Sequence, residues 1–171
     1  MNNATVKTIK KSYKTTFPSD MIFTKAYAST SDEQVEKLTR EFNIHYRSCI
    51  GSFIYLLSTR VYLSFEVHKL ANFSSNPGKV HFEGLVHLLG YIWNNNTLGL
   101  KYYADINDAH LSNLWRQAII KTDNQLMDFS DSSGKYCPET GRITGAYIIF
   151  YQGGTIDHAT HVPGQVAQAS A

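Results

Sequence analysis

The stretch Met127–Tyr151 constrains the fold of this chain more than any other part of the sequence. Met127, Phe129 and Asp131 alternate with polar residues, so they would share one face of a β-strand. The run Thr144–Tyr151 is β-branched and aromatic and is apolar at consecutive positions, which is typical of a strand covered on both faces. Residues that favour turns separate the two runs. The stretch therefore predicts two strands joined by a loop.

Asp131 is the residue of this stretch whose position suggests chemistry. A carboxylate at the tip of an apolar strand is a usual place to hold a divalent metal. The same pattern also describes a charged strand end that faces water. The residues alone leave both interpretations open. Asp128 alternates onto the opposite face of the strand and is the weaker candidate.

Helical patterns occupy the chain before these strands. Ser31 and Gln34 fit a capping box at the start of a first helix, which we expect to end near Asn43. Apolar residues at i, i+3, i+4 and i+7 then predict a second helix from about Arg47 to Ser58, with its core face at Ile50, Phe53, Ile54 and Leu57. Gly51 in this helix is interpreted as permitting close packing. Further helices are expected from beyond residue 61 to about 73 and over 80–93.

The fold class expected from this order is α+β, with a helical cluster followed by an antiparallel β unit. Residues 1–30 show little periodicity and are expected to be loose and basic, and residues 31–104 form the helical region, which closes with a short strand over 98–104. Residues 105–124 are expected to be a linker, and residues 125–171 form the β unit. No helix is expected to span a membrane, because the longest apolar runs are much too short.

Charge and cysteine content limit the classes of function. The net charge of +2 over 171 residues is too small to indicate a nucleic-acid-binding protein by itself. Four lysines nevertheless precede the first acidic residue and could contact a phosphate backbone, or form a solvated terminus: Lys7, Lys10, Lys11 and Lys14. Cys49 and Cys137 lack metal-ligand spacing, and no signal peptide is recognised, so we expect an intracellular protein in the cytoplasm or nucleus that is not secreted.

Several short motifs follow one another along the chain: Tyr46–Leu56, Thr59-Arg60, Phe73 with Asn76-Pro77, His81-Phe82-Glu83, Phe129-Ser130-Asp131, Arg142–Tyr147, and Gly153-Gly154 with Ile156. Taken in this order, they resemble the polyproteins of copia-type retrotransposons. The resemblance spans the end of the reverse transcriptase, its connection to RNase H, and the first strands of the RNase H domain.

The resemblance implies a fold and a mechanism. The helical cluster would correspond to the reverse transcriptase thumb and connection, and the β unit to a truncated RNase H-like domain. Such domains hydrolyse the RNA strand of an RNA–DNA hybrid with two Mg²⁺ ions held by carboxylates. Asp131 matches the first of these metal ligands. The family's next acid would fall just after Ala171, so the isolated chain is expected to bind no Mg²⁺ tightly and to lack hybrid-cleaving activity.

The sequence also departs from the pattern of that family. Where the family has a second acid and a tryptophan after the first strand acid, this chain has Ser133 and Gly134. Gly90 replaces an arginine in the fourth predicted helix. The alternative hypothesis is therefore a remnant without catalysis, kept by its host for binding nucleic acid or a protein.

Overall fold

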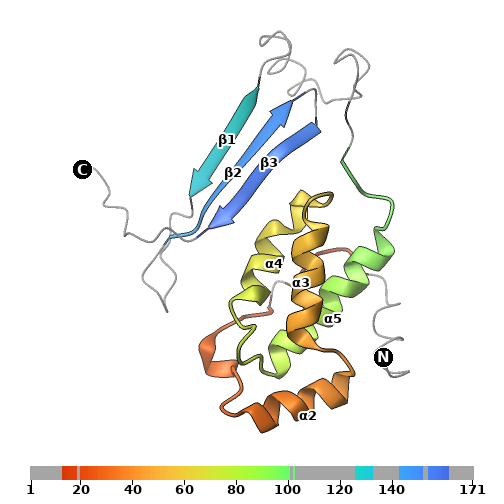
Figure 1. Ribbon diagram of the computed structural model, residues 1–171, viewed down its shortest axis with the longest axis vertical. Coiled ribbons are helices and arrows are strands. Elements are labelled where there is room, and N and C mark those ends of the chain that lie inside the picture. Colours follow the sequence, from red (N-terminus) through yellow and green to blue (C-terminus); the bar gives the residue numbers. More distant parts are fainter. Residues whose placement is uncertain are drawn as a thin grey trace, which may run out of the picture. The chain divides into compact units, whose positions relative to one another are not determined.

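The computed structural model describes residues 13–18, 20–100, 102, 126–132, 143–151 and 154–161. Within these residues the fold is α+β, with four α-helices followed by one three-stranded antiparallel sheet. The chain divides into two compact units, Met1–Leu98 and Gly99–Ala171, called here the helical unit and the sheet unit. Figure 1 shows the helices in the first unit and the strands in the second. The expected fold class is confirmed at this level.

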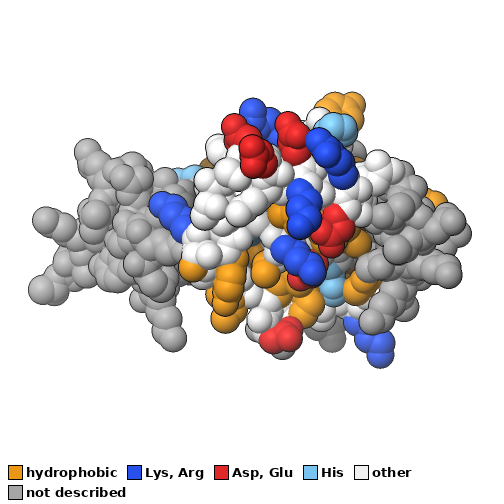
Figure 2. Space-filling model, turned by 90° about the horizontal axis from the view of Figure 1, so that it is seen from below, with side chains coloured by type: hydrophobic (Ala, Val, Ile, Leu, Met, Phe, Trp, Pro, Cys, Tyr) orange, Lys and Arg blue, Asp and Glu red, His pale blue; other side chains and the backbone are white. Residues whose placement is uncertain are grey.

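Helix α2 (Asp32–Phe42) begins as the sequence predicted. The Ser31 hydroxyl accepts a hydrogen bond from the Gln34 backbone N–H, at 3.4 Å. In a standard capping box the Gln34 side chain would accept a hydrogen bond from the backbone N–H of Ser31. Here Gln34 Oε1 instead accepts from the backbone N–H of Thr30, one residue earlier. Asn43 ends the helix in the left-handed conformation, with φ of 52°. Figure 2 views the molecule from the side of α2, where acidic and basic side chains are interspersed on the surface.

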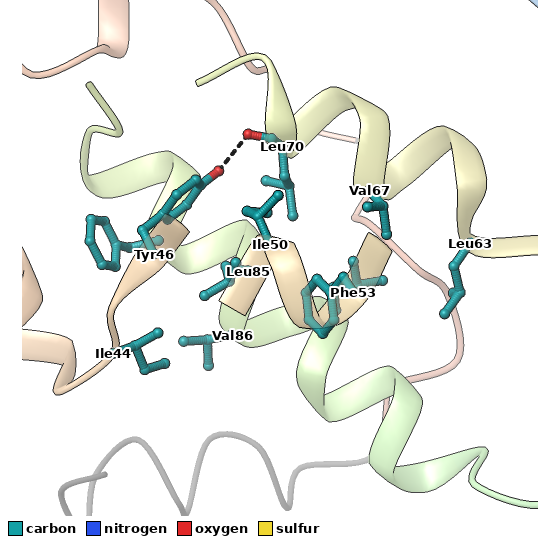
Figure 3. Close-up of a cluster of buried hydrophobic side chains, with 11 residues drawn as sticks. Ile44, Tyr46, Ile50, Phe53, Leu63, Val67, Leu70, Leu85 and Val86 are labelled. Atoms are coloured by element: carbon teal, nitrogen blue, oxygen red, sulfur yellow. Dashed lines mark hydrogen bonds between the residues drawn. The ribbon is translucent and has the colours of Figure 1, made fainter. Parts of the chain in front are cut away.

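The three other helices enclose the core of the helical unit. They are α3 (Tyr46–Leu56), α4 (Ser64–Ala71) and α5 (Lys79–Asn94), and a 3₁₀ turn, Val61–Leu63, leads into α4. Figure 3 shows how their apolar side chains converge. The buried core consists of Ile44, Tyr46, Ile50, Phe53, Leu63, Val67, Leu70, Phe82, Leu85, Val86 and Leu88.

Hydrogen bonds from two side chains connect the elements around this core. The Tyr46 hydroxyl donates to the carbonyl oxygen of Leu70 at 2.9 Å, which joins α3 to α4 (Figure 3). Burial raises the pKa of Tyr46 well above its ordinary value. Arg60 joins the end of α3 to the end of α5, because its guanidinium donates to the carbonyl oxygens of Asn95 and Asn96. These bonds satisfy carbonyls that a helix end would otherwise leave exposed.

Two expectations for α3 are wrong. Ile54 was assigned to the core face, but 56% of its surface is exposed. Gly51 was interpreted as a site of close packing, yet no atom outside the helix backbone lies within 4 Å of a Cβ placed there. The helix is rotated so that Tyr46, Ile50 and Phe53 point inward, at spacings of four and three residues. Periodicity located the helix correctly but misjudged the width of its buried face.

The described part of residues 13–30 packs against the helices and is not loose. Phe17 and Phe23 contact the core, with their ring centroids 4.9 Å apart. The Thr16 hydroxyl donates to a Glu66 carboxylate oxygen at 2.6 Å, and His87 Nε2 lies 2.9 Å from the carbonyl oxygen of Thr15. This segment therefore crosses both α4 and α5.

The sheet consists of β1 (Met127–Ser132), β2 (Gly145–Tyr151) and β3 (Gly154–His161), in the order β1-β2-β3. Met127, Phe129 and Asp131 pair with Phe150, Ile148 and Ala146 respectively, so the predicted alternation on β1 is confirmed. A register shift lies between Ile149 and Phe150, where β2 pairs with β3. Residues 152 and 153, which connect β2 to β3, lie outside the described residues.

Two expectations for the sheet unit need correction. The central residues of β2, Tyr147–Phe150, are only partly buried, so the strand is not enclosed on both faces. Leu98–Leu100 and Tyr102 are not in a strand, although a strand over 98–104 was expected. Tyr102 instead packs its ring against Gly154, and its hydroxyl donates to the Thr155 carbonyl oxygen at 2.7 Å. The expected linker over 105–124 lies outside the described residues.

Candidate functional site

Asp131 lies near the end of β1 and is exposed to solvent. Its Oδ1 accepts a hydrogen bond from the backbone N–H of Ser132, at 2.8 Å. Its cross-strand neighbour is Ala146, and Thr160 follows on β3, so the register brings no second carboxylate beside it. Among the described residues, no group of three or more His, Cys, Asp or Glu side chains could hold a metal ion. These residues do not fit a two-metal site, and Asp131 as a metal ligand stays a prediction.

The other acidic side chains of the sheet lie on the opposite face. Asp128 and Asp157 both pair with Ile149, one from each side. The Tyr147 hydroxyl donates to the Asp157 carboxylate at 3.2 Å, and this hydrogen bond raises the pKa of Tyr147. The register therefore separates Asp131 from the other two acids by the thickness of the sheet.

The expected phosphate-binding lysines can be placed only in part. Lys14 is exposed at the start of the described chain. Lys7, Lys10 and Lys11 lie outside the described residues. The proposed contact of these four lysines with a nucleic acid therefore stays a prediction.

The surface of the helical unit contains a groove that no sequence motif indicated. It has a volume of about 470 Å³ and lies between the segment 18–27 and the first turns of α5. Its apolar lining includes exposed Ile22 and Tyr27 together with half-buried Met21. The described residues that line it are Pro18, Asp20, Met21, Ile22, Tyr27, Val80 and Glu83. We call this feature the α5 groove.

Cys49 is the nucleophilic side chain of the helical unit. It is a free thiol on α3, partly buried beside the core. Burial raises the pKa of this thiol to about 11, because an apolar environment disfavours the thiolate. The thiolate is the reactive form of cysteine, so this residue is a structural thiol and not an activated nucleophile.

We expect Cys49 to react with iodoacetamide about a hundredfold more slowly at pH 8 than an unperturbed thiol of pKa about 8.5. The rate should keep rising with pH up to about 11, because the folded pKa is raised. The measurement uses a Cys137→Ser chain, in which Cys49 is the remaining cysteine. The same chain unfolded in urea is the control and should show a plateau near pH 9. A plateau near pH 9 in the folded chain as well would contradict the assignment.

Comparisons with known proteins add one finding. No family model matches the chain, and no solved structure matches it. The chain is similar to a secreted effector. That protein is secreted RxLR effector protein 161 of Plasmopara viticola, which is 27% identical over 129 residues. The match covers 75% of this chain and 80% of the effector.

This finding corrects the expected identity. The similarity is to an effector and not to a retrotransposon polyprotein, so the resemblance to a copia-type reverse transcriptase and RNase H was wrong as an identification. The functions expected from it, including the alternative of a host-retained remnant, are withdrawn as well. Residues of two of the quoted motifs have structural roles: Tyr46, Ile50 and Phe53 are buried in the core, and Arg60 binds carbonyls at the end of α5.

The expected location is also wrong. An intracellular protein that is not secreted was predicted from the cysteine pattern and the N-terminal residues, whereas the similar protein is a secreted one. Two widely spaced cysteines are weak evidence of compartment, because a domain with a large enough core needs no disulfide in either environment. In the described part of the chain, no helix is long and apolar enough to cross a bilayer.

Proposed function

We propose that this chain is a secreted effector-type protein that acts by binding another protein through its helical unit. The observation that supports secretion and effector function is the similarity to the effector of Plasmopara viticola, which extends over most of both chains. The tetrapeptide Arg-x-Leu-Arg does not occur in the 171 residues, so the similarity does not depend on that motif.

The surface of the helical unit supports binding as the mode of action. The core side chains of the helical unit are buried, whereas the apolar side chains of Ile22 and Tyr27 are exposed in the α5 groove. Apolar side chains gathered in a hollow, with polar groups at its edge, are typical of interaction sites in proteins.

The proposal is tested by locating the protein in cultures of the organism that makes it. Antibodies raised against the folded chain would be applied to culture medium and to washed cell extract. We expect the protein in the medium, enriched at least tenfold relative to a cytosolic enzyme measured in the same samples. The cytosolic enzyme controls for cell lysis. Protein confined to the cell extract would refute the proposed secretion.

A further inference from the structure

The two walls of the α5 groove are fixed to each other by packing and hydrogen bonds. The ring of Phe23 lies against Gly84 of α5, where a Cβ would approach it to 2.6 Å, and Met21 Sδ lies beside the same glycine. At the other end of the segment, Ser29 donates to the Pro77 carbonyl oxygen at 2.7 Å through its hydroxyl. Its backbone N–H donates to the Asn76 carbonyl oxygen at 3.0 Å. The groove is therefore part of the folded helical unit.

The floor and sides of the groove are apolar and accessible. Ile22 is 62% exposed and Tyr27 is 53% exposed, and half-buried Val80 extends this surface onto α5. A groove of about 470 Å³ has room for a few side chains of a peptide and is small for a folded domain. Burying Ile22 and Tyr27 against a partner would remove large apolar side chains from water.

Two carboxylates lie at the rim of this apolar surface, one on each wall. Asp20 belongs to the N-terminal segment and Glu83 to α5, and both are exposed. Neither forms an ion pair or a hydrogen bond with a side chain within the described residues. Lys79, which is exposed at the start of α5, does not line the groove. The groove thus combines an apolar floor with two acidic groups available to a cation.

We propose that the α5 groove binds a peptide segment of another protein in which an apolar side chain is flanked by lysine or arginine. The apolar side chain contacts Ile22 and Tyr27, and the flanking cations pair with Asp20 and Glu83. Charge complementarity selects this occupant over an acidic segment, because like charges at the rim would oppose binding. This proposal rests on the proposed function, in which the chain acts by binding another protein. Its test measures peptide binding to the α5 groove and does not depend on secretion.

The test measures binding of labelled nonapeptides to the full chain by fluorescence anisotropy. One library has a central Leu, Ile, Phe or Trp flanked on both sides by Lys or Arg, and a matched library has Glu in place of the basic residues. We expect saturable binding of the basic library at least tenfold tighter than that of the acidic library. Raising the salt concentration should weaken it, because the pairs are exposed at the rim.

Substitutions in the groove locate the binding, each beside a matched control. Ile22→Ser should weaken binding tenfold or more, whereas Ile54→Ser, at a similarly exposed isoleucine on α3, should leave it unchanged. Glu83→Gln should weaken binding about threefold, within the range of an exposed ion pair, and Glu36→Gln on α2 should not. Circular dichroism of each variant confirms that the helices are intact.

The other outcomes overturn the proposal. Failure of the basic library to bind, or equal binding of the acidic library, excludes the proposed partner. Equal effects of Ile22→Ser and Ile54→Ser exclude the groove. Self-association that Ile22→Ser abolishes would make a second copy the occupant, and peptide binding that appears only after removal of residues 1–12 would assign the groove to the chain's own basic segment. Peptide binding by a protein confined to cells would refute secretion but leave the groove proposal intact.

Discussion

Replacing Gly78 with alanine is expected to destabilise the helical unit by about 3 kcal/mol. A Cβ at this position would lie 1.6 Å from the carbonyl oxygen of Tyr27, so the backbone of one segment has to move. The segment that contains Tyr27 is held in place by the hydrogen bonds of Ser29 to residues 76 and 77. It cannot shift without breaking these bonds. The φ of Gly78 is −94°, so the cost comes from the close approach and not from a forbidden backbone conformation.

Urea unfolding followed by circular dichroism at 222 nm measures this effect, since the helices belong to the same unit. The matched control is Gly51→Ala. Gly51 faces open space on α3, so alanine should raise the free energy of unfolding by about 0.5–1 kcal/mol through better helix propensity. Opposite signs for the two substitutions are the expected result. A stabilising Gly78→Ala would show that Tyr27 does not contact this turn.

Replacing Phe82 with alanine is expected to destabilise the helical unit by about 3–5 kcal/mol. Phe82 has no exposed surface and lies at the centre of the core. Its ring centroid is 5.2 Å from that of Phe42 and 5.2 Å from that of Tyr46, so it connects α2, α3 and α5. Removing the ring takes away apolar contacts on several sides and leaves a cavity that three helices cannot close without moving.

Phe65→Ala on α4 is the control for this prediction. Phe65 is 49% exposed and contacts the Lys69 ammonium across its ring at 5.5 Å, so its loss should cost less than about 1 kcal/mol. Both variants are compared with the parent chain by urea unfolding and by the midpoint of thermal unfolding. Similar losses for the two phenylalanines would contradict the position of Phe82 at the core centre.

Local signals in the sequence were enough to predict the four helices and the alternation of side chains on β1. Ser31 marks the start of α2 because its side chain bonds to the backbone three residues further on. Pro77-Gly78 lies between α4 and α5, since the residue before a proline disfavours the helical conformation. The alternation of Met127, Phe129 and Asp131 predicted which residues share a face of β1. Each of these signals depends on residues close together in the chain, and so sequence reasoning can find them.

Features that depend on distant residues could not be predicted in the same way. Phe17 and Phe23 lack a periodic neighbourhood, yet they complete the core because α4 and α5 offer them a surface. The α5 groove joins residues 18–27 to residues 80–83, which are unrelated in sequence pattern. The sequence around a helical glycine such as Gly51 does not show whether the glycine faces a neighbouring element or water. Only the three-dimensional arrangement distinguishes these cases.

The candidate site was also beyond reach of the sequence. Asp131 drew attention because of its place at a strand end, but the register surrounds it with Ala146 and Ser132 and not with further acids. Asp20 and Glu83 were not recognised as candidates in the sequence, because isolated acidic residues on a protein surface are common. They became a candidate pair only when the groove placed them on opposite walls of an apolar surface.

The crossing of residues 13–18 over α4 and α5 has a consequence for how the protein emerges from the ribosome. Thr15 contacts His87, which is translated 72 residues later. Thr16 contacts Glu66, which is translated 50 residues later. Domains fold as units during synthesis, and contacts between distant residues close late because of the entropy of loop closure. Residues 13–18 are therefore expected to dock after α4 and α5 have formed, once α5 has left the exit tunnel.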